Sequence, residues 1–230
     1  MAQIITFANQ KGGTGKTQCT VLAAAALAGL NYKVLVIDAD DQQSITTARQ
    51  FDNPTPEAFQ LITAPSEDLY KVLSEQDHHQ DFIFIDLPGR LDMNLPIKDQ
   101  RIIKALMYVD FLFIPFVSGN YNLESTLKFI NVVKRVEALR ADQARGISVH
   151  GYINMYVKRS RLNDYLKQDI EAIEDKTGIP FMEGPLKRLT AFSEASTTES
   201  IYNPKARNEA SFNFAQWFNE LTNIIDYEKG

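Results

Sequence analysis

The chain has 230 residues, of which 44% are hydrophobic and 23% are charged, which fits one α/β domain with a full core. Its single cysteine, Cys19, excludes a disulfide framework, a cysteine-rich zinc site and an iron–sulfur cluster built from this chain, and is typical of a reducing cytoplasm. The formal net charge of -5 argues against a globally basic nucleic-acid binder, and we expect neither a signal peptide nor a membrane span.

Short apolar runs alternate with segments of helical periodicity along the chain. The runs, rich in Ile, Val and Phe, cover residues 4–8, 34–37, 82–85, 111–116 and 147–153. Strands that are apolar at every position are expected where both faces are buried, so we predict a doubly wound, mostly parallel sheet with helices on both faces. Apolar residues at helical spacing predict the longer helices, at residues 14–30, 123–143 and 209–228.

The chain has no internal repeat, low-complexity tract or Gly/Ser linker, so we expect a single domain over residues 1–230. Two stretches are predicted to be irregular. The first, Asp52 to Ser66, contains Pro54, Pro56 and Pro65 and is predicted to be a surface connection before a short helix at residues 68–74. The second covers residues 182–204.

The sequence NQKGGTGKTQ, residues 9–18, lies between the first predicted strand and the first predicted helix. This placement is typical of a P-loop, in which glycines let N–H groups converge on phosphate oxygens and the helix dipole favours anions. Lys16 is expected to reach the β- and γ-phosphates, and the Thr17 hydroxyl to bind Mg²⁺. The remaining nucleotide ligands are expected to be Gly12, Gly13, Thr14, Gly15 and Gln18. A glycine turn with two solvated lysines is the alternative reading.

The loop departs from the ordinary P-loop motif. Gln10 stands where the first glycine of that motif belongs, and a second lysine, Lys11, follows it.

Carboxylates follow two predicted strands at the edge of the sheet where ligands of open α/β folds bind. The sequence VLVIDADDQQS supplies Asp38 and Asp40, and DFIFIDLPG supplies Asp86. The pair would serve a metal and an attacking water, although helix capping is the alternative for aspartates after a strand. Asp86 has the position of an aspartate that holds Mg²⁺ in P-loop ATPases. Together with the P-loop, these residues predict ATP and Mg²⁺ as ligands.

The run KGGTGKT, with Lys11 at its start, resembles the deviant Walker A motif of the ParA/MinD/Soj family of ATPases. VLVIDADDQQS is similar to their second motif, and FLFIPFVSGNYNLEST and GPLKRLTAFSEAS resemble a later strand and loop. The resemblance spans nearly the whole chain and implies a P-loop NTPase fold with slow ATP hydrolysis. It also implies a homodimer around ATP, in which Lys11 reaches the phosphates bound in the partner subunit.

The resemblance assigns roles to individual positions. Asp40 would position or activate the attacking water, while Asp38 and Asp86 would support Mg²⁺. Asn154 matches a position that contacts adenine, and Pro185 lies in the late loop that closes over the base.

Two departures from the family pattern affect loops beside the site. Asp41 replaces a usual proline, and Gly89-Arg90 stands where two prolines are common. Both put in question the rate and the trigger of hydrolysis.

Seven basic residues are grouped in the last third of the chain: Lys158, Arg159, Arg161, Lys187, Arg188, Lys205 and Arg207. Resemblance to ParA-type members implies that they bind DNA nonspecifically in the ATP dimer, with a ParB-like adaptor that stimulates hydrolysis. The implied role is partition of a plasmid, chromosome or mobile element by a cytoplasmic, nucleoid-associated protein. Ordinary solvated surface charge is the alternative reading of the basic group.

The C-terminal segment bears on a membrane partner. It is amphipathic but acidic, with Glu220, Asp226 and Glu228 against Lys229, so no membrane binding is expected. Its aromatic stripe is predicted to pack on the sheet instead.

Two other functions remain open. One is a MinD-like or cargo-positioning ATPase that acts on a membrane or a protein scaffold. The other is a metabolic P-loop enzyme resembling dethiobiotin synthetase, against which Lys11 argues.

Overall fold

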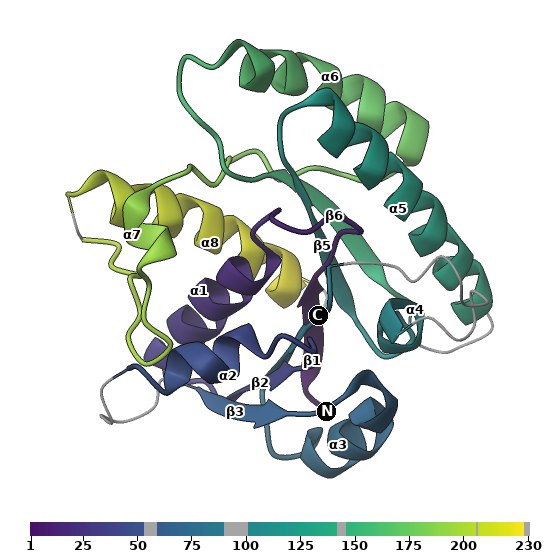
Figure 1. Cartoon of the computed structure of the whole chain (residues 1–230), viewed down its shortest axis with the longest axis vertical. Coiled ribbons are helices and arrows are strands. Elements are labelled where there is room, and N and C mark those ends of the chain that lie inside the picture. Colours follow the sequence, from purple (N-terminus) through teal and green to yellow (C-terminus); the bar gives the residue numbers. More distant parts are fainter. Residues whose placement is uncertain (53–58, 90–100, 142–145, 206, 228–230) are drawn as a thin grey trace.

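The computed structural model describes residues 1–52, 59–89, 101–141, 146–205 and 207–227 (Figure 1). These residues contain a six-stranded sheet in the order β3-β2-β4-β1-β5-β6, and every strand pair is parallel. The strands are β1 (Gln3–Phe7), β2 (Val34–Asp38), β3 (Gln60–Thr63), β4 (Phe82–Asp86), β5 (Phe111–Phe116) and β6 (Ser148–Ile153). The predicted α/β fold with a parallel sheet is confirmed.

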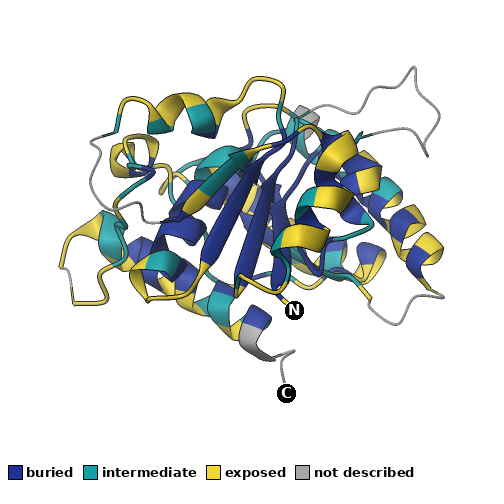
Figure 2. Ribbon diagram, turned by 90° about the horizontal axis from the view of Figure 1, so that it is seen from below, coloured by how far each residue is buried: buried dark blue, intermediate teal, exposed yellow. Residues whose placement is uncertain are grey.

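Helices connect the strands and cover both faces of the sheet (Figures 1 and 2). They are α1 (Lys16–Gly29), α2 (Ser44–Arg49), α3 (Leu69–Gln76), α4 (Arg101–Leu106), α5 (Asn120–Arg140), α6 (Arg161–Thr177), α7 (Thr190–Ser193) and α8 (Glu209–Tyr227). The three long helices predicted from the sequence are confirmed as α1, α5 and α8, and the predicted short helix at residues 68–74 is confirmed as α3. In the described part of the chain, no helix is both long and apolar enough to cross a bilayer.

Alternate residues of each strand enter two separate cores, because successive side chains of a strand point to opposite faces. Ile4 packs with α3, α4, α5 and α6 on one face, whereas Ile5 and Phe7 pack with α1 and α8 on the other. The second face is aromatic, with the Phe7 ring 5.8 Å from that of Trp217. Small buried alanines of α1, such as Ala23 and Ala26, leave room for these rings.

The aromatic stripe of α8 forms part of this second core. Phe214, Trp217, Phe218 and Leu221 are all buried on the sheet. The prediction that this stripe packs on the sheet is therefore confirmed. Glu228 and Lys229 lie outside the described residues.

The prediction of an irregular connection over residues 52–66 is wrong at residues 60–63, which form β3. This strand pairs with β2 from Leu35 opposite Gln60 to Asp38 opposite Thr63. It is a short edge strand whose end residues are exposed and whose two central residues are only half-buried. It therefore lacks the continuous apolar run that marked the inner strands. Pro54 and Pro56 lie outside the described residues.

The opposite edge of the sheet is covered by residues 180–188, part of the second stretch predicted to be irregular. Gly151 N donates to Pro180 O at 2.8 Å, and Leu186 N donates to Ile153 O at 2.9 Å. Gly151 permits this approach, because a Cβ there would lie 2.7 Å from the Phe181 ring. The pairing brings the late loop to the carboxyl end of β6.

Candidate active site

The loop between β1 and α1 has the backbone of a phosphate-binding turn. Gly13 and Gly15 have φ angles of 75° and 85°, in the left-handed region that favours glycine. A side chain at Gly15 would also lie 2.5 Å from Asn154 Nδ2. These two glycines turn the chain so that α1 begins at Lys16, and the free N–H groups of its first turn provide a site for an anion.

A cleft of about 460 Å³ lies in front of this loop. Its walls come from the P-loop, the loop after β2 and the loop after β4. The lining residues are Gly12, Gly13, Lys16, Thr17, Asp40, Asp41, Gln42, Ser44, Pro88 and Gly89. The structure thus brings the predicted phosphate loop and Asp40 together around one space.

Lys16 is buried at the base of the cleft. Its Nζ donates to the backbone oxygen of Lys11 at 3.2 Å. Burial lowers the pKa of Lys16, while the nearby charges of Asp86 and Asp40 act to raise it. The ammonium group therefore lies close to carboxylates in a site where water does not fully solvate it, which strengthens its attraction for a phosphate.

Asp38 and Asp86 end adjacent strands and lie opposite each other in the parallel register. Asp38 Oδ2 accepts hydrogen bonds from the backbone N and the hydroxyl of Thr46, both at 2.9 Å. Asp38 Oδ1 is buried without a hydrogen-bond partner among the described residues, and both carboxylate oxygens of Asp86 are buried with no well-formed hydrogen bond, although the Thr17 hydroxyl lies near them. Unpaired buried carboxylate oxygens are costly, so this pair is suited to a bound cation.

The environment of Asp86 explains its proton affinity. Burial raises the pKa of Asp86 to about 7, although the Thr17 hydroxyl and the Lys16 charge act to lower it. Mg²⁺ binds proteins through one or two carboxylates together with substrate phosphates. The residues present at this point, Thr17, Asp38 and Asp86, fit that ion.

Of the two residues expected near adenine, Asn154 contacts the P-loop, whereas Pro185 contacts α8. Asn154 is buried, and its Nδ2 donates to Thr14 O at 2.7 Å and lies 3.7 Å from Cys19 Sγ. Its Oδ1 accepts from Met155 N and has a second acceptor position for a base N–H. Pro185 is half-buried, and its carbonyl accepts from Asn213 Nδ2 on α8 at 2.9 Å. Adenine contact by either residue stays a prediction.

Lys11 is not among the residues that line the phosphate cleft. It is half-buried, and its Nζ contacts Asn122 Oδ1 in the first turn of α5. The carbonyl of Asn122 accepts from the Thr126 hydroxyl, which in turn accepts from Asn9 Nδ2 at 2.8 Å. Sequence reasoning missed these three polar residues, because only the fold brings α5 to the start of the P-loop.

The departure at Asp41 has a partner in the structure. Both carboxylate oxygens of Asp41 lie 2.6 Å from Nη1 of Arg101, at the start of α4, and Arg101 Nε lies 3.3 Å from Glu67. The pair connects the loop after β2 to α4, although exposed ion pairs of this kind contribute less than about 1 kcal/mol. Arg101 was not predicted from the sequence. Arg90, part of the second departure, lies outside the described residues.

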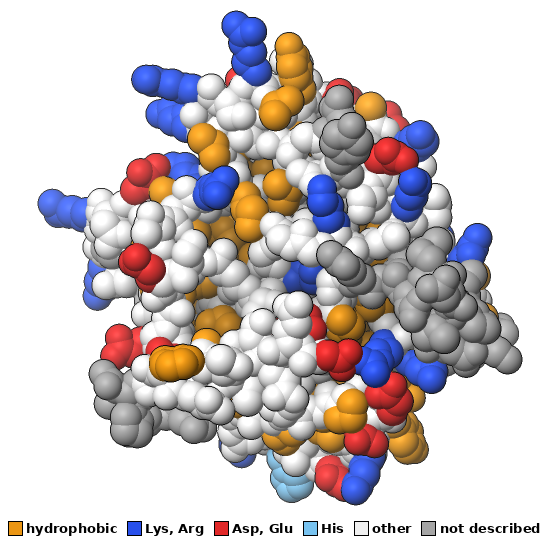
Figure 3. Space-filling view, in the orientation of Figure 1, with side chains coloured by type: hydrophobic (Ala, Val, Ile, Leu, Met, Phe, Trp, Pro, Cys, Tyr) orange, Lys and Arg blue, Asp and Glu red, His pale blue; other side chains and the backbone are white. Residues whose placement is uncertain are grey.

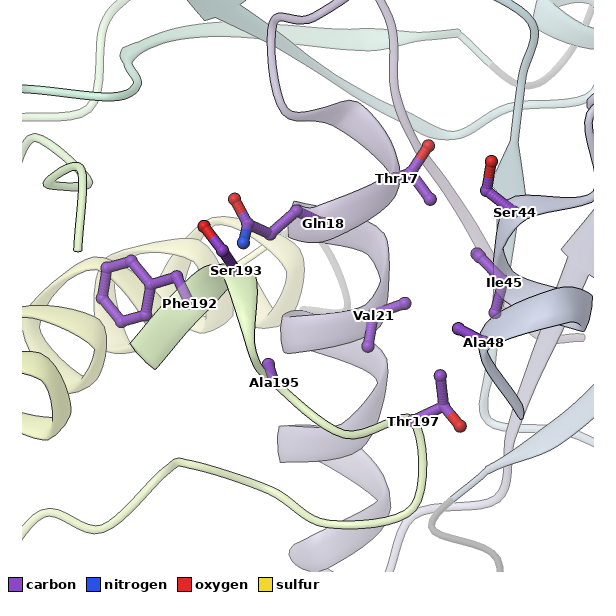
Figure 4. A pocket seen from close by; sticks show the side chains of 10 residues that line it. All are labelled: Thr17, Gln18, Val21, Ser44, Ile45, Ala48, Phe192, Ser193, Ala195 and Thr197. Carbon is purple, nitrogen blue, oxygen red and sulfur yellow. The ribbon is translucent and has the colours of Figure 1, made fainter. Parts of the chain in front are cut away.

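A smaller pocket of about 280 Å³ adjoins the cleft at Thr17 and Ser44. Figure 4 shows Val21, Ile45 and Ala48 facing one another across the space between α1 and α2. Phe192, Ser193, Ala195, Thr197 and Gln18 complete its lining. The exposed surface of its walls is mostly apolar, and a pocket at this place was not predicted from the sequence, although its lining includes two predicted nucleotide ligands, Thr17 and Gln18.

Comparison with known proteins identifies the family. Residues 5–201 match the family described as the CobQ/CobB/MinD/ParA nucleotide binding domain. The chain belongs to this family. As a member of it, the protein is an ATPase of the ParA/MinD class.

Relatives of this family member differ in their described functions. The chromosome-partitioning ATPase Soj of Treponema pallidum is 25% identical over 214 residues, which cover 76% of this chain and 81% of Soj. The septum site-determining protein MinD of Pyrococcus horikoshii, complexed with Mg-ADP, has a TM-score of 0.70 and 19% identity over 98% of both chains.

A third relative is an enzyme of small-molecule metabolism. Cobyrinic acid a,c-diamide synthase of Mycobacterium smegmatis, with bound ADP and magnesium, has a TM-score of 0.73 and 15% identity, covering 98% of this chain and 96% of that chain. Structural likeness at these identities shows the fold alone.

We expect Asp86→Asn to raise the free energy of unfolding by about 2 to 4 kcal/mol at pH 8 in the absence of nucleotide and Mg²⁺. Because the pKa of Asp86 is raised on folding, the folded protein holds the proton more tightly than the unfolded chain. Wild-type stability should therefore fall as the pH rises from about 4 through about 7 and change no further above it. Urea denaturation across this range measures the effect.

The variant lacks this carboxylate, so its stability should converge on that of the wild type near pH 4. Asp169→Asn, at an exposed site on α6, serves as the control and should change stability by less than about 0.5 kcal/mol. A variant less stable than the wild type at pH 8 would contradict the assignment of a costly buried charge.

Proposed function

We propose that this ATPase forms a homodimer around ATP and acts as a ParA-type partition ATPase. The observation that carries the proposal is the second lysine of the P-loop. Lys16 lines the phosphate cleft, whereas the side chain of Lys11 ends at Asn122, outside the residues that line it. A lysine placed beside, but not in, its own cleft is suited to reach the cleft of a second copy.

Electrostatics explains how such a dimer would depend on the nucleotide. ATP with one Mg²⁺ keeps excess negative charge, which a lysine from the partner would neutralise in a water-poor interface. Removing the γ-phosphate removes much of that attraction. ATP would therefore hold the two copies together, and hydrolysis would release them.

Residues of the cleft are suited to orient the attacking water and to hold Mg²⁺ during hydrolysis. Asp40 Oδ1 accepts from Gln42 N at 3.0 Å, and its Oδ2 has no hydrogen-bond partner among the described residues. Asp40 would use this oxygen to orient the attacking water. Thr17, Asp38 and Asp86 would hold Mg²⁺, which stabilises charge on the phosphates.

A basic corner supports DNA as the partner. Lys187 and Lys158 both lower the pKa of Glu209, Lys187 through an ion pair of 2.7 Å, so the turn before α6, the late loop and the start of α8 meet there. Figure 3 shows Lys and Arg side chains gathered at the upper left, where Figure 1 places these segments. The other exposed basic residues of these segments are Arg159, Arg161, Arg188, Lys205 and Arg207. Such a surface would bind duplex phosphates, and dimerisation would double it.

This proposal extends to a ParB-like adaptor that stimulates hydrolysis and to a cytoplasmic, nucleoid-associated location. Two findings favour it over a MinD-like membrane role. The apolar stripe of α8 is buried on the sheet, and Glu209 and Glu220 keep its polar side acidic.

We expect Lys11→Ala to retain ATP binding within a few-fold but to lose ATP-dependent dimerisation. The change removes the proposed contact with the partner's phosphates, whereas the other contact that it removes, with Asn122, lies outside the cleft of the same subunit. Light scattering with a non-hydrolysable ATP analogue measures the mass. Lys71→Ala, at an exposed site on α3, should dimerise like the wild type. Dimers of Lys11→Ala at wild-type affinity would show that this lysine does not join the subunits.

Asp40→Ala should stay dimeric with ATP while its hydrolysis rate falls at least about a hundredfold, the usual contribution of a general base. Phosphate release and light scattering on the same sample measure the two properties. Asp169→Ala is the matched exposed control. Normal turnover by Asp40→Ala would remove this residue from the catalytic group.

Binding to nonspecific duplex DNA and to anionic liposomes, each with ATP, ADP or no nucleotide, separates the candidate functions. We expect the protein to bind DNA in the presence of ATP but not with ADP or without nucleotide. The logarithm of the binding constant should fall linearly with the logarithm of the salt concentration. The double change Arg159→Ala and Arg161→Ala should weaken DNA binding about tenfold, since each lost phosphate contact costs affinity. The pair Lys134→Ala and Arg135→Ala, exposed on α5, is the control.

Other outcomes would favour the alternatives. Liposome binding without DNA binding would indicate the MinD-like function. ATP turnover that requires a small co-substrate would indicate a metabolic enzyme.

A further inference from the structure

The loop after β2 places two carboxylates in the phosphate cleft. Asp40 and Asp41 both line the cleft, whereas Lys16 is the only basic residue among its described lining residues. Like charges in one site repel each other, and a triphosphate brings further negative charge. Asp41 therefore needs a cation of its own if the cleft is to bind ATP well.

Arg101 supplies this cation. It comes from the start of α4, and its Nη1 lies 2.6 Å from both carboxylate oxygens of Asp41. Its Nε lies 3.3 Å from Glu67, so one guanidinium group serves two carboxylates. The side chains of Arg101 and Asp41 are 39% and 73% exposed, so the pair adds little to the stability of the fold. Its effect is expected instead on the charge and the position of the loop at the cleft.

The turn that carries Asp41 also carries Asp40. Asp40 Oδ1 accepts from Gln42 N at 3.0 Å, and the carbonyl of Asp40 accepts from Gln43 N at 2.9 Å. Gln43 has a φ angle of 48°, in the left-handed region that is unfavourable for residues with a side chain. Asp41 lies inside this turn, so an ion pair that fixes its carboxylate also limits the movement of Asp40.

We propose that Arg101 is a positioning residue for ATP hydrolysis, which acts through Asp41 on the turn that carries Asp40. Arg101 holds this turn against α4 and neutralises Asp41 beside the phosphates. Asp40 then keeps the orientation in which it can hold the attacking water. The inference rests on the proposed role of Asp40 but not on the dimer or on DNA.

The test is a double-mutant cycle on the hydrolysis rate at saturating ATP, measured by phosphate release. Arg101→Gln and Asp41→Asn should each lower kcat about fivefold. The double variant should be no slower than either single variant, because each change breaks the same contact. Arg101→Lys should keep at least about half of the wild-type rate, since a single nitrogen contacts Asp41 and a point charge can replace it.

Two control variants separate this role from others. Glu67→Gln removes the other partner of Arg101 and should leave kcat within about twofold of the wild type. Lys128→Gln breaks an exposed ion pair of 2.7 Å with Glu124 on α5, outside the cleft lining, and should have as small an effect. Light scattering with a non-hydrolysable ATP analogue should show the same assembly for each variant as for the wild type.

Three results would overturn the proposal. Additive losses in the cycle would show that Arg101 does not act through Asp41. A higher KM for ATP at an unchanged kcat would make Arg101 a phosphate ligand, and a loss of dimers in Arg101→Gln would make it an interface residue.

The turnover of Asp40→Ala tests the proposed function separately. If that variant is inactive while the cycle shows no coupling, only the role of Arg101 fails. If it hydrolyses ATP normally, the role of Asp40 fails, and the role of Arg101 fails with it.

A second measurement uses the sensitivity of exposed ion pairs to salt. The Debye length falls to about 3 Å at 1 M ionic strength, so the Arg101 pair is screened there. At saturating ATP, the difference in kcat between the wild type and Arg101→Gln should therefore disappear at about 1 M KCl. A difference that is the same at low and high salt would contradict an electrostatic role.

Discussion

The burial of opposite charges at the carboxyl edge of the sheet is the constraint on which the site depends. Lys16 and Asp86 are both buried there, and among the described residues the carboxylate of Asp86 is stabilised only by the nearby Thr17 hydroxyl and the Lys16 charge. Such an arrangement costs folding energy, because neither charge recovers its lost hydration within the free protein. The chemistry of these residues fits a phosphate beside Lys16 and a divalent cation beside Asp86.

The parallel sheet creates this arrangement. β1, β2 and β4 are neighbours, and their carboxyl ends present the P-loop, Asp38 and Asp86 at one edge. The loops after β2 and β4 then form the cleft walls that face the P-loop. Each of these loops follows directly on a buried strand. A displacement of either loop at the phosphates would therefore be transmitted to the core through only a few residues.

Features that depend on a pattern of neighbouring residues could be predicted from the sequence. Inner strands are apolar throughout, and the P-loop joins glycines, a lysine and a threonine within a few positions. The edge strand β3 was missed because its end residues are polar, and α6 was missed although Leu166, Ile170 and Ile173 follow helical spacing. The contacts of Lys11 with Asn122, and of Asp41 with Arg101, join residues far apart in the chain, so no local pattern reveals them.

The coverage of β6 by residues 180–188 limits how two copies can meet. Unpaired strand edges invite growth of a sheet from one molecule into the next and, with it, fibrous aggregates. In this protein the edge at β6 is covered by backbone hydrogen bonds with residues 180–188. The edge strand at the other side, β3, is short and has exposed polar residues at both ends. Association through a shared sheet is therefore disfavoured, and the proposed dimer would have to form through side chains and loops and not through strand pairing.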